Sequence, residues 1–468
     1  MFHKTAIPLA LLLVTQGLLA QQPPTSGGLL PSAPPQAPPR VLPEMRIEPR
    51  AAPSAPLAGE ARVVVMRLRI TGASLYSEAD LLSVTGFVPG SEATLSQLQA
   101  MAARITSRYR ADGYFVAQAY LPAQDIQDQS VTIAVNEGRY GAIELRNNAG
   151  LSEGTLRGKL DGLGGGDAIE VTALEERLLL LSDLPGVVVK STLSPGRQPG
   201  TSDLLVDVTP GRRVTGSIDG DNAGNRYTGA YRAGATVNVN EPFGLGDVAT
   251  LRVLTSGSGL RYARLSYQMQ AGRAQVGVAY STLDYELGKE FRPLGAHGTA
   301  GVASAFARVP LLRSRHTNVF AQLSLDAKQF RDVIDTVPSR VDRRTHVLAA
   351  SVYGDHSDSL GGGGVTSYSV TVAAGDVDIR TPGARALDAS TARSNGGFGK
   401  VAFSLMRLQS LGGPFSIYGS LSGQAAGKNL DPSEKKELGG MNAVRAYPEG
   451  EAFADQGLLG TVELRKDL

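Results

Sequence analysis

From Arg213 to the end of the chain, apolar and polar residues alternate one by one within successive short segments. This period of two predicts β-strands that have one apolar face and one polar face. We count about twelve such strands, the last of which begins at Gly457 and still alternates at Arg465. Alternation is clearest over residues 231–239, 249–253, 263–269 and 275–280, recurs near 347, 366, 401, 415 and 458, and is weaker near 302 and 319.

A two-faced sheet of this size fits either a soluble sandwich or a membrane barrel. The polar faces carry Arg, Gln, Asn and Ser, which suit a wet lumen, and the apolar faces end in Tyr or Phe. Long and short connections also alternate, as they do at the two rims of an outer-membrane barrel. We therefore expect an antiparallel transmembrane β-barrel over residues 212–468. The long connections expected are 283–297, 328–344, 375–396 and 424–456, and the short ones are 271–272, 310–315 and 408–414.

The N-terminus has the pattern of a secretory signal peptide over residues 1–20. Lys4 precedes an apolar run from Ala6 to Val14, and the small residue Ala20 ends the segment. A buried core helix is the alternative, since the run is too short to span a bilayer. Residues 21–60 are rich in Pro and Ala, which predicts an extended periplasmic linker.

Two segments of similar layout follow, at residues 61–137 and 138–211. Each predicts the order β-α-α-β-β within about 75 residues, enough for a small core of its own. Repetition of one unit indicates an array of modules instead of one catalytic domain. The first has strands at 63–70, 115–121 and 131–135 and a helix at 91–110, and the second has strands at 141–145, 187–193 and 203–208 and a helix at 174–181.

Residue patterns for catalysis or cofactor binding are not found in the sequence. The net charge is only +2, there is no cysteine, and none of the five histidines pairs at metal-ligand spacing. Residues 244–249 match a relaxed dinucleotide fingerprint, but strand residues follow instead of a helix, so a hairpin turn is predicted. Residues 219–224 lack the later ligands of a calcium loop, and the glycines at 361–364 predict a turn. We expect no enzyme activity, no cofactor, no metal and no nucleic acid.

One motif lies within the long connection 424–456. Its residues are Gly439, Gly440, Val444, Arg445, Ala446, Tyr447 and Pro448. This segment resembles the sixth extracellular loop of the TpsB family, the ShlB/FhaC/HecB haemolysin secretion and activation proteins, in which a V-R-G/A-Y/F tip folds back into the barrel lumen. The two modules resemble that family's POTRA pair, including the run from Asp112 to Pro122. The resemblance covers about residues 60–468.

The resemblance implies α+β POTRA domains in the periplasm and a barrel in the Gram-negative outer membrane. The family barrel has sixteen strands, so we expect a fragment or a truncated reading frame. The implied function is export and activation of a TpsA-type exoprotein, a haemolysin or adhesin, in two-partner (type Vb) secretion. Outer-membrane lipid and the barrel-assembly machinery are further expected partners, and we expect a monomer. A barrel-protein insertase of the same superfamily and a passive porin are the alternatives.

Two sets of site residues follow from these expectations. An Arg in the lumen needs acceptors, so Arg445 should meet a carboxylate or other acceptors on the inner wall. The family's own partner, an Asp on the strand after the next turn, would lie beyond Leu468. Family members often begin with a plug helix, but the prolines between 23 and 56 argue against one. Exoprotein docking by strand addition is expected at the module edges, through Val187, Val189, Ala117 and Tyr120.

Overall fold

The structure is a computed structural model that describes residues 5–9, 23–31, 44–47, 62–126, 128–441 and 443–467. The chain divides into two compact units, one of residues 40–211 and one of residues 1–39 with 212–468. No helix among the described residues combines the length and apolar character needed to cross a membrane.

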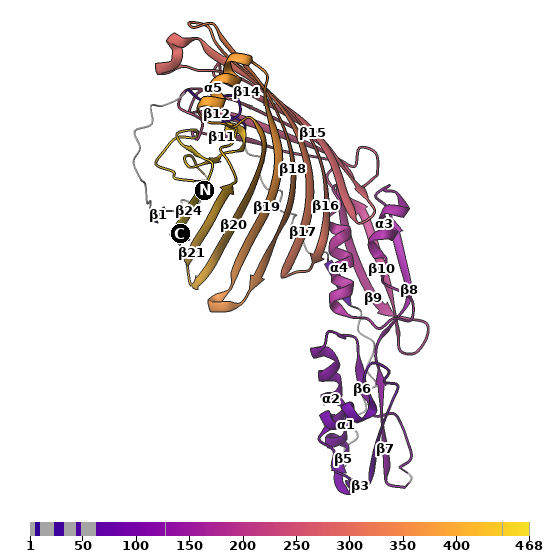
Figure 1. Ribbon diagram of the computed structural model, residues 1–468. Helices are drawn as coiled ribbons and strands as arrows, with labels where there is room; N and C mark the ends of the chain where they lie inside the picture. Colours follow the sequence, from indigo (N-terminus) through magenta and orange to yellow (C-terminus); the bar gives the residue numbers. More distant parts are fainter. Residues whose placement is uncertain are drawn as a thin grey trace. The chain divides into compact units, whose positions relative to one another are not determined.

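Twelve antiparallel strands from Val214 to Lys466 form one large sheet in which each strand pairs with its neighbour in sequence (Figure 1). The expected strand count and the antiparallel fold class are confirmed. A further strand, β1 (Thr5–Leu9), pairs with β24 at one edge, while β11 forms the other edge. The twelve are β11 (Val214–Asp221), β12 (Arg232–Asn240), β13 (Val248–Thr255), β14 (Leu260–Ala271), β15 (Ala274–Glu286), β16 (Ala296–Arg313), β17 (Thr317–Ile334), β18 (Ser339–Asp358), β19 (Gly364–Ile379), β20 (Gly396–Gly412), β21 (Phe415–Ala426) and β24 (Gly457–Lys466).

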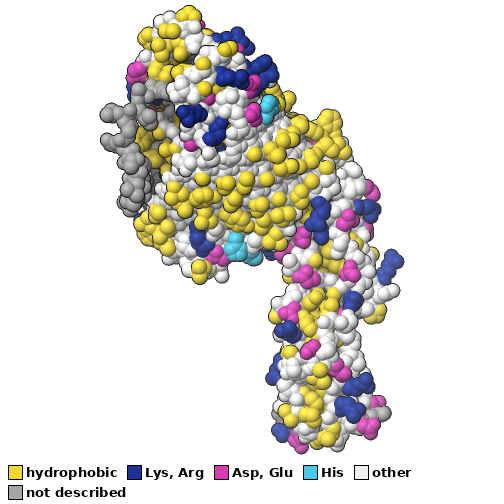
Figure 2. All heavy atoms as spheres, in the orientation of Figure 1, with side chains coloured by type: hydrophobic (Ala, Val, Ile, Leu, Met, Phe, Trp, Pro, Cys, Tyr) yellow, Lys and Arg dark blue, Asp and Glu magenta, His cyan; other side chains and the backbone are white. Residues whose placement is uncertain are grey.

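The strand register sorts side chains onto two faces. Leu251, Leu265 and Tyr280 stand side by side on three neighbouring strands and are exposed. We call their face the outer face, and Figure 2 shows hydrophobic side chains in a continuous band across the sheet. Arg252 and Arg264, which are also register partners, point to the opposite, inner face. An apolar band outside and charges inside are what a lipid-facing wall around a wet lumen requires.

The connections confirm the order of the loops but correct several lengths. Residues 427–456 form the sixth connection on their rim, as counted from the sequence. The expected loop at 328–344 is wrong, because Arg331 on β17 and Asp342 on β18 are register partners joined by an ion pair, and the strands continue to a turn at 335–338. Pro310, expected in a turn, lies in β16 beside a bulge, where a strand tolerates a missing N–H. Residues 408–412 belong to β20.

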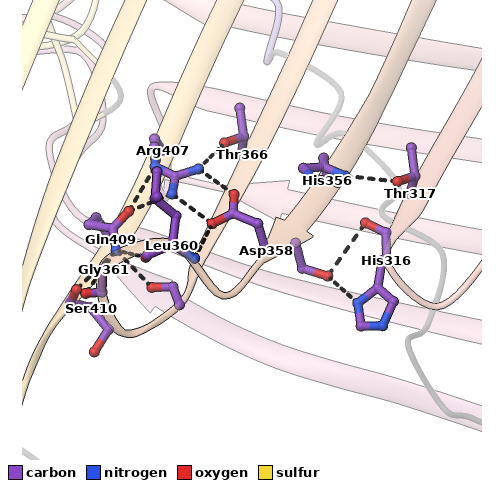
Figure 3. A network of polar contacts seen from close by, with 12 residues as sticks. His316, Thr317, His356, Asp358, Leu360, Gly361, Thr366, Arg407, Gln409 and Ser410 are labelled. Carbon is purple, nitrogen blue, oxygen red and sulfur yellow. Dashed lines mark hydrogen bonds and ion pairs between the residues drawn. The ribbon is translucent and has the colours of Figure 1, made fainter.

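The glycine run at 361–364 lies at a short turn that a polar network fastens to the next strand (Figure 3). Positive φ angles at Gly361 to Gly363 allow the tight path. Arg407 on β20 donates to both oxygens of Asp358 on β18, at 2.8 and 3.0 Å, and Gln409 donates to the carbonyl oxygen of Leu360 at 2.7 Å. This ion pair lies at the end of the outer face, where charges next to a bilayer cost least.

In the unit of residues 40–211, the first module is built around a long amphipathic helix, α2 (Leu95–Ala111). Leu98, Ala102, Ile105 and Tyr109 recur at helical spacing and are buried, and Thr94 caps the helix through a capping box with Gln97. The expected single strand at 63–70 is broken at Met66. The other elements are β3 (Arg62–Val65), β4 (Arg67–Thr71), α1 (Glu78–Thr85), β5 (Ser91–Thr94), β6 (Gln118–Tyr120) and β7 (Ser130–Asn136), with sheets β4-β7-β6 and β3-β5.

The second module has the expected order β-α-α-β-β. Leu174, Leu178 and Leu181 of α4 pack against Val206 of the sheet in one apolar core. A short strand from the Pro-rich segment, β2, adds to the outer edge of this sheet, whose order is β2-β9-β10-β8. The elements are β2 (Glu44–Ile47), β8 (Arg139–Asn147), α3 (Glu153–Leu160), α4 (Val171–Ser182), β9 (Val187–Pro195) and β10 (Thr201–Pro210).

One buried carboxylate joins the two modules. Glu137 is 4% exposed and accepts hydrogen bonds from the amides of Ser74 and Leu75, from the Tyr109 hydroxyl, and from Arg139 at the start of the second module. Burial opposes ionisation of Glu137, but the hydrogen bonds from Ser74, Leu75 and Arg139 outweigh it and lower its pKa to about 2. The ionised form therefore holds the junction together.

Replacing Glu137 with Gln should destabilise this unit. The folded pKa lies below the unfolded value of 4.5, so the stability is present above about pH 4.5 and is lost as the pH falls toward 2. At pH 7 we expect a loss of about 3 kcal/mol. Hydrogen exchange of β4 and β7 in the full chain measures it, with Glu144→Gln in an exposed pair as the control. Equal exchange in Glu137→Gln and wild type would contradict the assignment.

Candidate functional site

Residues 427–456, hereafter loop 6, lie against the inner face of the sheet. The loop contains a short 3-10 turn (Pro432–Glu434) and a two-residue ladder between β22 (Lys436–Glu437) and β23 (Phe453–Ala454). Its charged residues reach side chains on β12, β17, β18, β20 and β24. A loop with so little regular structure needs these side-chain contacts to hold one position.

The first attachment is a buried chain of charges at the start of loop 6. Arg343 on β18 donates to Asp431 of the loop at 2.9 Å and to Asp332 on β17 at 2.7 Å. The Tyr285 hydroxyl donates to the other oxygen of Asp332 at 2.8 Å. A buried charge without a partner costs several kcal/mol, so each of these groups depends on the others staying in place.

A second attachment lies three residues further on. The carboxylate of Glu434 is buried and accepts from Lys328 on β17 at 2.6 Å and from Lys400 on β20 at 2.9 Å. Burial favours the neutral form of Glu434, but the two lysines outweigh this and keep its pKa below the usual value. Glu434 therefore bridges two strands that are not neighbours in the sheet.

The far end of loop 6 is held at β12. Glu449 pairs with Arg232 at 2.5 Å, and Arg232 also pairs with Asp221 on β11 at 2.9 Å. Asn225, from the first connection of this rim, donates to the carbonyl oxygen of Glu449 at 2.7 Å. The loop thus spans the inner face from β17, β18 and β20 to β12.

The motif residues shape the tip of loop 6. The Gly440 amide donates to the carbonyl oxygen of Tyr447 at 2.9 Å, and the Val444 amide donates to that of Leu438 at 3.2 Å. Gly440 has a φ of +93°, which favours glycine. A β-carbon at Gly439 would collide with the carbonyl oxygen of Pro448. The two glycines are therefore needed for the tip to close on itself, with Ala446 and Tyr447 exposed.

Arg445 reaches the wall at β24. It pairs with Glu463 at 2.7 Å, and Arg465 holds the other oxygen of the same carboxylate at 2.7 Å. Glu463 is 1% exposed, whereas the Arg445 side chain is 51% exposed, so only the carboxylate of this pair is buried. The expected carboxylate partner exists, but on the strand directly after the loop. In the sequence, Glu463 could be recognised only as an acidic residue at an inward position of the alternation, between Val462 and Leu464.

The Pro-rich stretch also contributes to the inner face. Residues 23–31 form turns, and the buried Ser26 donates its amide to Asp332 at 2.8 Å. Leu29 packs into an apolar cluster that includes Tyr262 and Phe330. Apart from residues 5–9, the expected signal peptide lies outside the described residues. So does most of the expected linker, in which only residues 23–31 and 44–47 are described.

Of the expected docking residues, Tyr120 lies on β6, Val187 and Val189 lie on β9, and Ala117 directly precedes β6, but not all of them are accessible. Ala117 is fully buried and Val189 points into the core of its module, whereas Tyr120 is exposed and Val187 is half-buried. Among the described residues, β6 pairs only with β7, and β9 carries β2 on its outer edge. Strand addition at these edges would therefore use the main chain more than side chains.

The comparisons with known proteins agree with this architecture. The model of the haemolysin secretion/activation protein family ShlB/FhaC/HecB matches residues 200–467, and the ShlB-type POTRA domain model matches residues 63–138. The chain belongs to this family. Its members are transporters that move partner exoproteins across the outer membrane, so this chain is an outer-membrane protein whose POTRA domains lie in the periplasm.

Individual relatives cover most of the chain. The heme/hemopexin transporter protein HuxB of Haemophilus influenzae is 30% identical over 380 residues, which are 80% of this chain and 67% of HuxB. The outer membrane transporter CdiB of Dickeya dadantii is 23% identical over 409 residues, 85% of this chain and 71% of that protein. The structure of CdiB from Escherichia coli has the same fold, with a TM-score of 0.66 at 21% identity over 88% of this chain and 78% of that one.

The family to which this chain belongs consists of transporters. Within residues 62–126, 128–441 and 443–467 and the shorter described segments, no three His, Cys, Asp or Glu side chains are grouped to hold a metal ion. Asp219 and Asp221, in the incomplete calcium-like run, pair instead with Arg252 and Arg232.

Removing Arg445 or Glu463 should give the same defect, because each acts through the other. Arg445→Ala and Glu463→Gln should both fold but change single-channel conductance, and the double variant should be no worse than Glu463→Gln, which also loses the pair with Arg465. Planar-bilayer recordings measure the conductance, and gel mobility before and after heating reports folding. Arg385→Ala, in an exposed ion pair with Asp378, is the control. Additive effects would show that the pair is not a unit.

Glu434→Gln should loosen loop 6, because Lys328 and Lys400 would lose the carboxylate between them. Removing one partner of a buried ion pair costs about 3–5 kcal/mol, and the loop carries trypsin sites at Lys435, Lys436 and Arg445. We expect limited trypsin cleavage within the loop at least tenfold faster than in wild type. Glu290→Gln, in an exposed ion pair with Arg226 outside loop 6, is the control. An unchanged cleavage rate would contradict the role of Glu434 in holding loop 6.

Proposed function

We propose that this chain exports and activates one TpsA-type exoprotein, a haemolysin or adhesin, in two-partner secretion. The observation that supports this best is the attachment of loop 6 to the inner wall by separate ion pairs at Asp431, Glu434, Arg445 and Glu449. Such contacts fix the loop at rest but can be exchanged for contacts with water or with a passing chain. If apolar packing held the loop instead, its contacts could not be exchanged in this way.

The route of export passes along the inner face. A cavity of about 420 Å³ lies between residues 23–31, the wall of β14 to β17, and loop 6. Its lining includes both signs of charge, among them Arg264, Asp326 and Lys328. Residues 23–31 and loop 6 both border this space, so a polypeptide that passes here has to displace them.

In our mechanism, the unfolded exoprotein arrives in the periplasm and pairs as an added strand with the POTRA edges near Val187 or Tyr120. It then threads the lumen while the Arg445–Glu463 pair opens and loop 6 moves. No ATP is needed, because folding of the exoprotein outside the cell supplies the free energy. Insertion by the barrel-assembly machinery and a monomeric state complete the proposal.

Deleting either POTRA domain, residues 60–137 or 138–211, should abolish export while the barrel still inserts. The reason is that each deletion removes one strand-addition edge and the Glu137 junction. Export of the partner exoprotein is measured in the culture medium, and barrel insertion is measured by heat-dependent gel mobility. Normal secretion by either deletion would refute the docking role of that domain.

A further inference from the structure

The outer face changes from apolar to basic near one end of β17 and β18. Leu325 and Leu348 are register partners on the two strands, are exposed, and belong to the apolar band. Closer to the turn at 335–338, the outer positions of the same strands include Arg331, Arg340 and Arg344. Figure 2 shows Lys and Arg side chains gathered beyond one edge of the hydrophobic band. A basic surface therefore borders the part of the wall that faces lipid.

This end of the outer face belongs to the rim that carries loop 6. The turn at 335–338 is the fourth connection on that rim, and loop 6 is the sixth. The second POTRA domain ends with β10 at Pro210 and β11 begins at Val214, so the rim at Val214 is the periplasmic one. The three arginines consequently lie at the opposite boundary of the bilayer, beside its outer leaflet.

The spacing along β18 places these arginines at the height of lipid headgroups. His346 and His356 both point to the outer face, ten residues apart, and the outer positions between them hold only Leu, Ala, Val and Gly. Ten residues of a strand cover about 34 Å, and a tilt of about 40° reduces this to a height of about 26 Å. The apolar band of an outer-membrane barrel is about 25 Å tall. Arg344, the next outer position beyond His346, therefore lies just outside the hydrocarbon.

Arginines outnumber the acidic residues at this boundary. At this end of β17, β18 and β19 and in residues 380–385, the outer charges are five arginines and three aspartates, a net charge of +2. They are Arg331, Arg340, Arg344, Arg380, Arg385, Asp342, Asp376 and Asp378. Arg331 and Arg340 share Asp342, at 3.0 and 2.8 Å, while Asp378 pairs with an arginine that follows β19. Arg344 is exposed and has no ion pair or side-chain hydrogen bond among the described residues.

The periplasmic end of the same wall has no such excess. There the outer charges of β18 and β20 are Asp358 and Arg407, which neutralise each other in one ion pair at 2.8 Å (Figure 3). Because the two ends differ in this way, the basic surface is not a general feature of the bilayer boundary. Its charge is complementary to an anion found at the outer leaflet.

We propose that Arg331, Arg340 and Arg344 bind the phosphate groups of a phosphorylated glycolipid in the outer leaflet, with its acyl chains along Leu325 and Leu348. A guanidinium donates two parallel hydrogen bonds to phosphate oxygens, and a phosphate monoester carries up to two negative charges. The bound lipid holds the β17–β18 hairpin at a fixed height in the membrane. This inference does not depend on which protein is exported.

The chain has no tryptophan, so Gln329→Trp supplies a single fluorescent reporter. Position 329 is exposed on the outer face and is the register partner of Arg344. The purified full-length chain is reconstituted in phosphatidylcholine vesicles that contain increasing fractions of dansyl-labelled lipid A with two phosphates. Energy transfer from the tryptophan to the dansyl group measures binding. The same lipid without its phosphates is the matched probe.

We expect half-maximal transfer at a lipid A fraction at least ten times lower than for the lipid without phosphates. Arg344→Gln should raise that fraction at least threefold, and Arg331→Gln with Arg344→Gln at least tenfold. Arg292→Gln, at an exposed arginine of the preceding connection on the same rim, is the control and should change nothing. Arg344→Gln removes no contact within the described residues, so its gel mobility before and after heating should match that of the wild-type chain.

Equal transfer to lipid A and to the lipid without phosphates, or an unchanged response of both arginine variants, would overturn the proposal. So would equal transfer to dansyl-labelled phosphatidylglycerol, because the surface would then take any anionic lipid. Release of lipid A by inorganic phosphate alone would show a site for the free ion and would likewise contradict the glycolipid.

Discussion

Charge pairing across the inner face is the interaction on which the rest of this structure depends. The strand alternation places lipid-compatible side chains such as Leu251 and Leu265 on one face, and turns charged side chains such as Arg252 and Arg264 to the other. Arg343 and Glu434 are buried there and Asp332 is partly buried, and each is satisfied by a partner from another strand or from loop 6. Because an isolated buried charge is costly, the same pairing holds loop 6 against the inner face.

Local patterns determined what could be predicted. The period of two predicted twelve strands, and the spacing of Leu98, Ala102 and Ile105 predicted α2. The alternation of long and short connections identified loop 6 as the sixth long one. Partners distant in sequence could not be predicted. Glu463 is one acidic residue in a strand, and nothing local marks it as the partner of Arg445. The charged residues near 331–343 resemble a loop in the sequence, because their pairing across two strands cannot be recognised without the register.

The Pro-rich segment shows a second limit of local reasoning. Its composition argues against a core or a long helix, and the described parts have neither. Yet Ser26 donates to Asp332 and Leu29 packs into an apolar cluster of the sheet, while Glu44 to Ile47 add to β9, because each finds its partner on a folded domain. A segment too polar to fold alone can still take a defined position where a folded domain offers it partners.

The central claim is that the sheet separates lipid from a wet lumen, and neighbouring residues on β14 test it directly. Arg264→Cys and Leu265→Cys are each labelled in intact outer membranes, first with a membrane-impermeant maleimide and then with a fluorophore quenched by spin-labelled lipid. The account predicts labelling by the maleimide at position 264 alone and lipid quenching at 265 alone. Water access at 265 with lipid contact at 264, or the same environment at both, would contradict it.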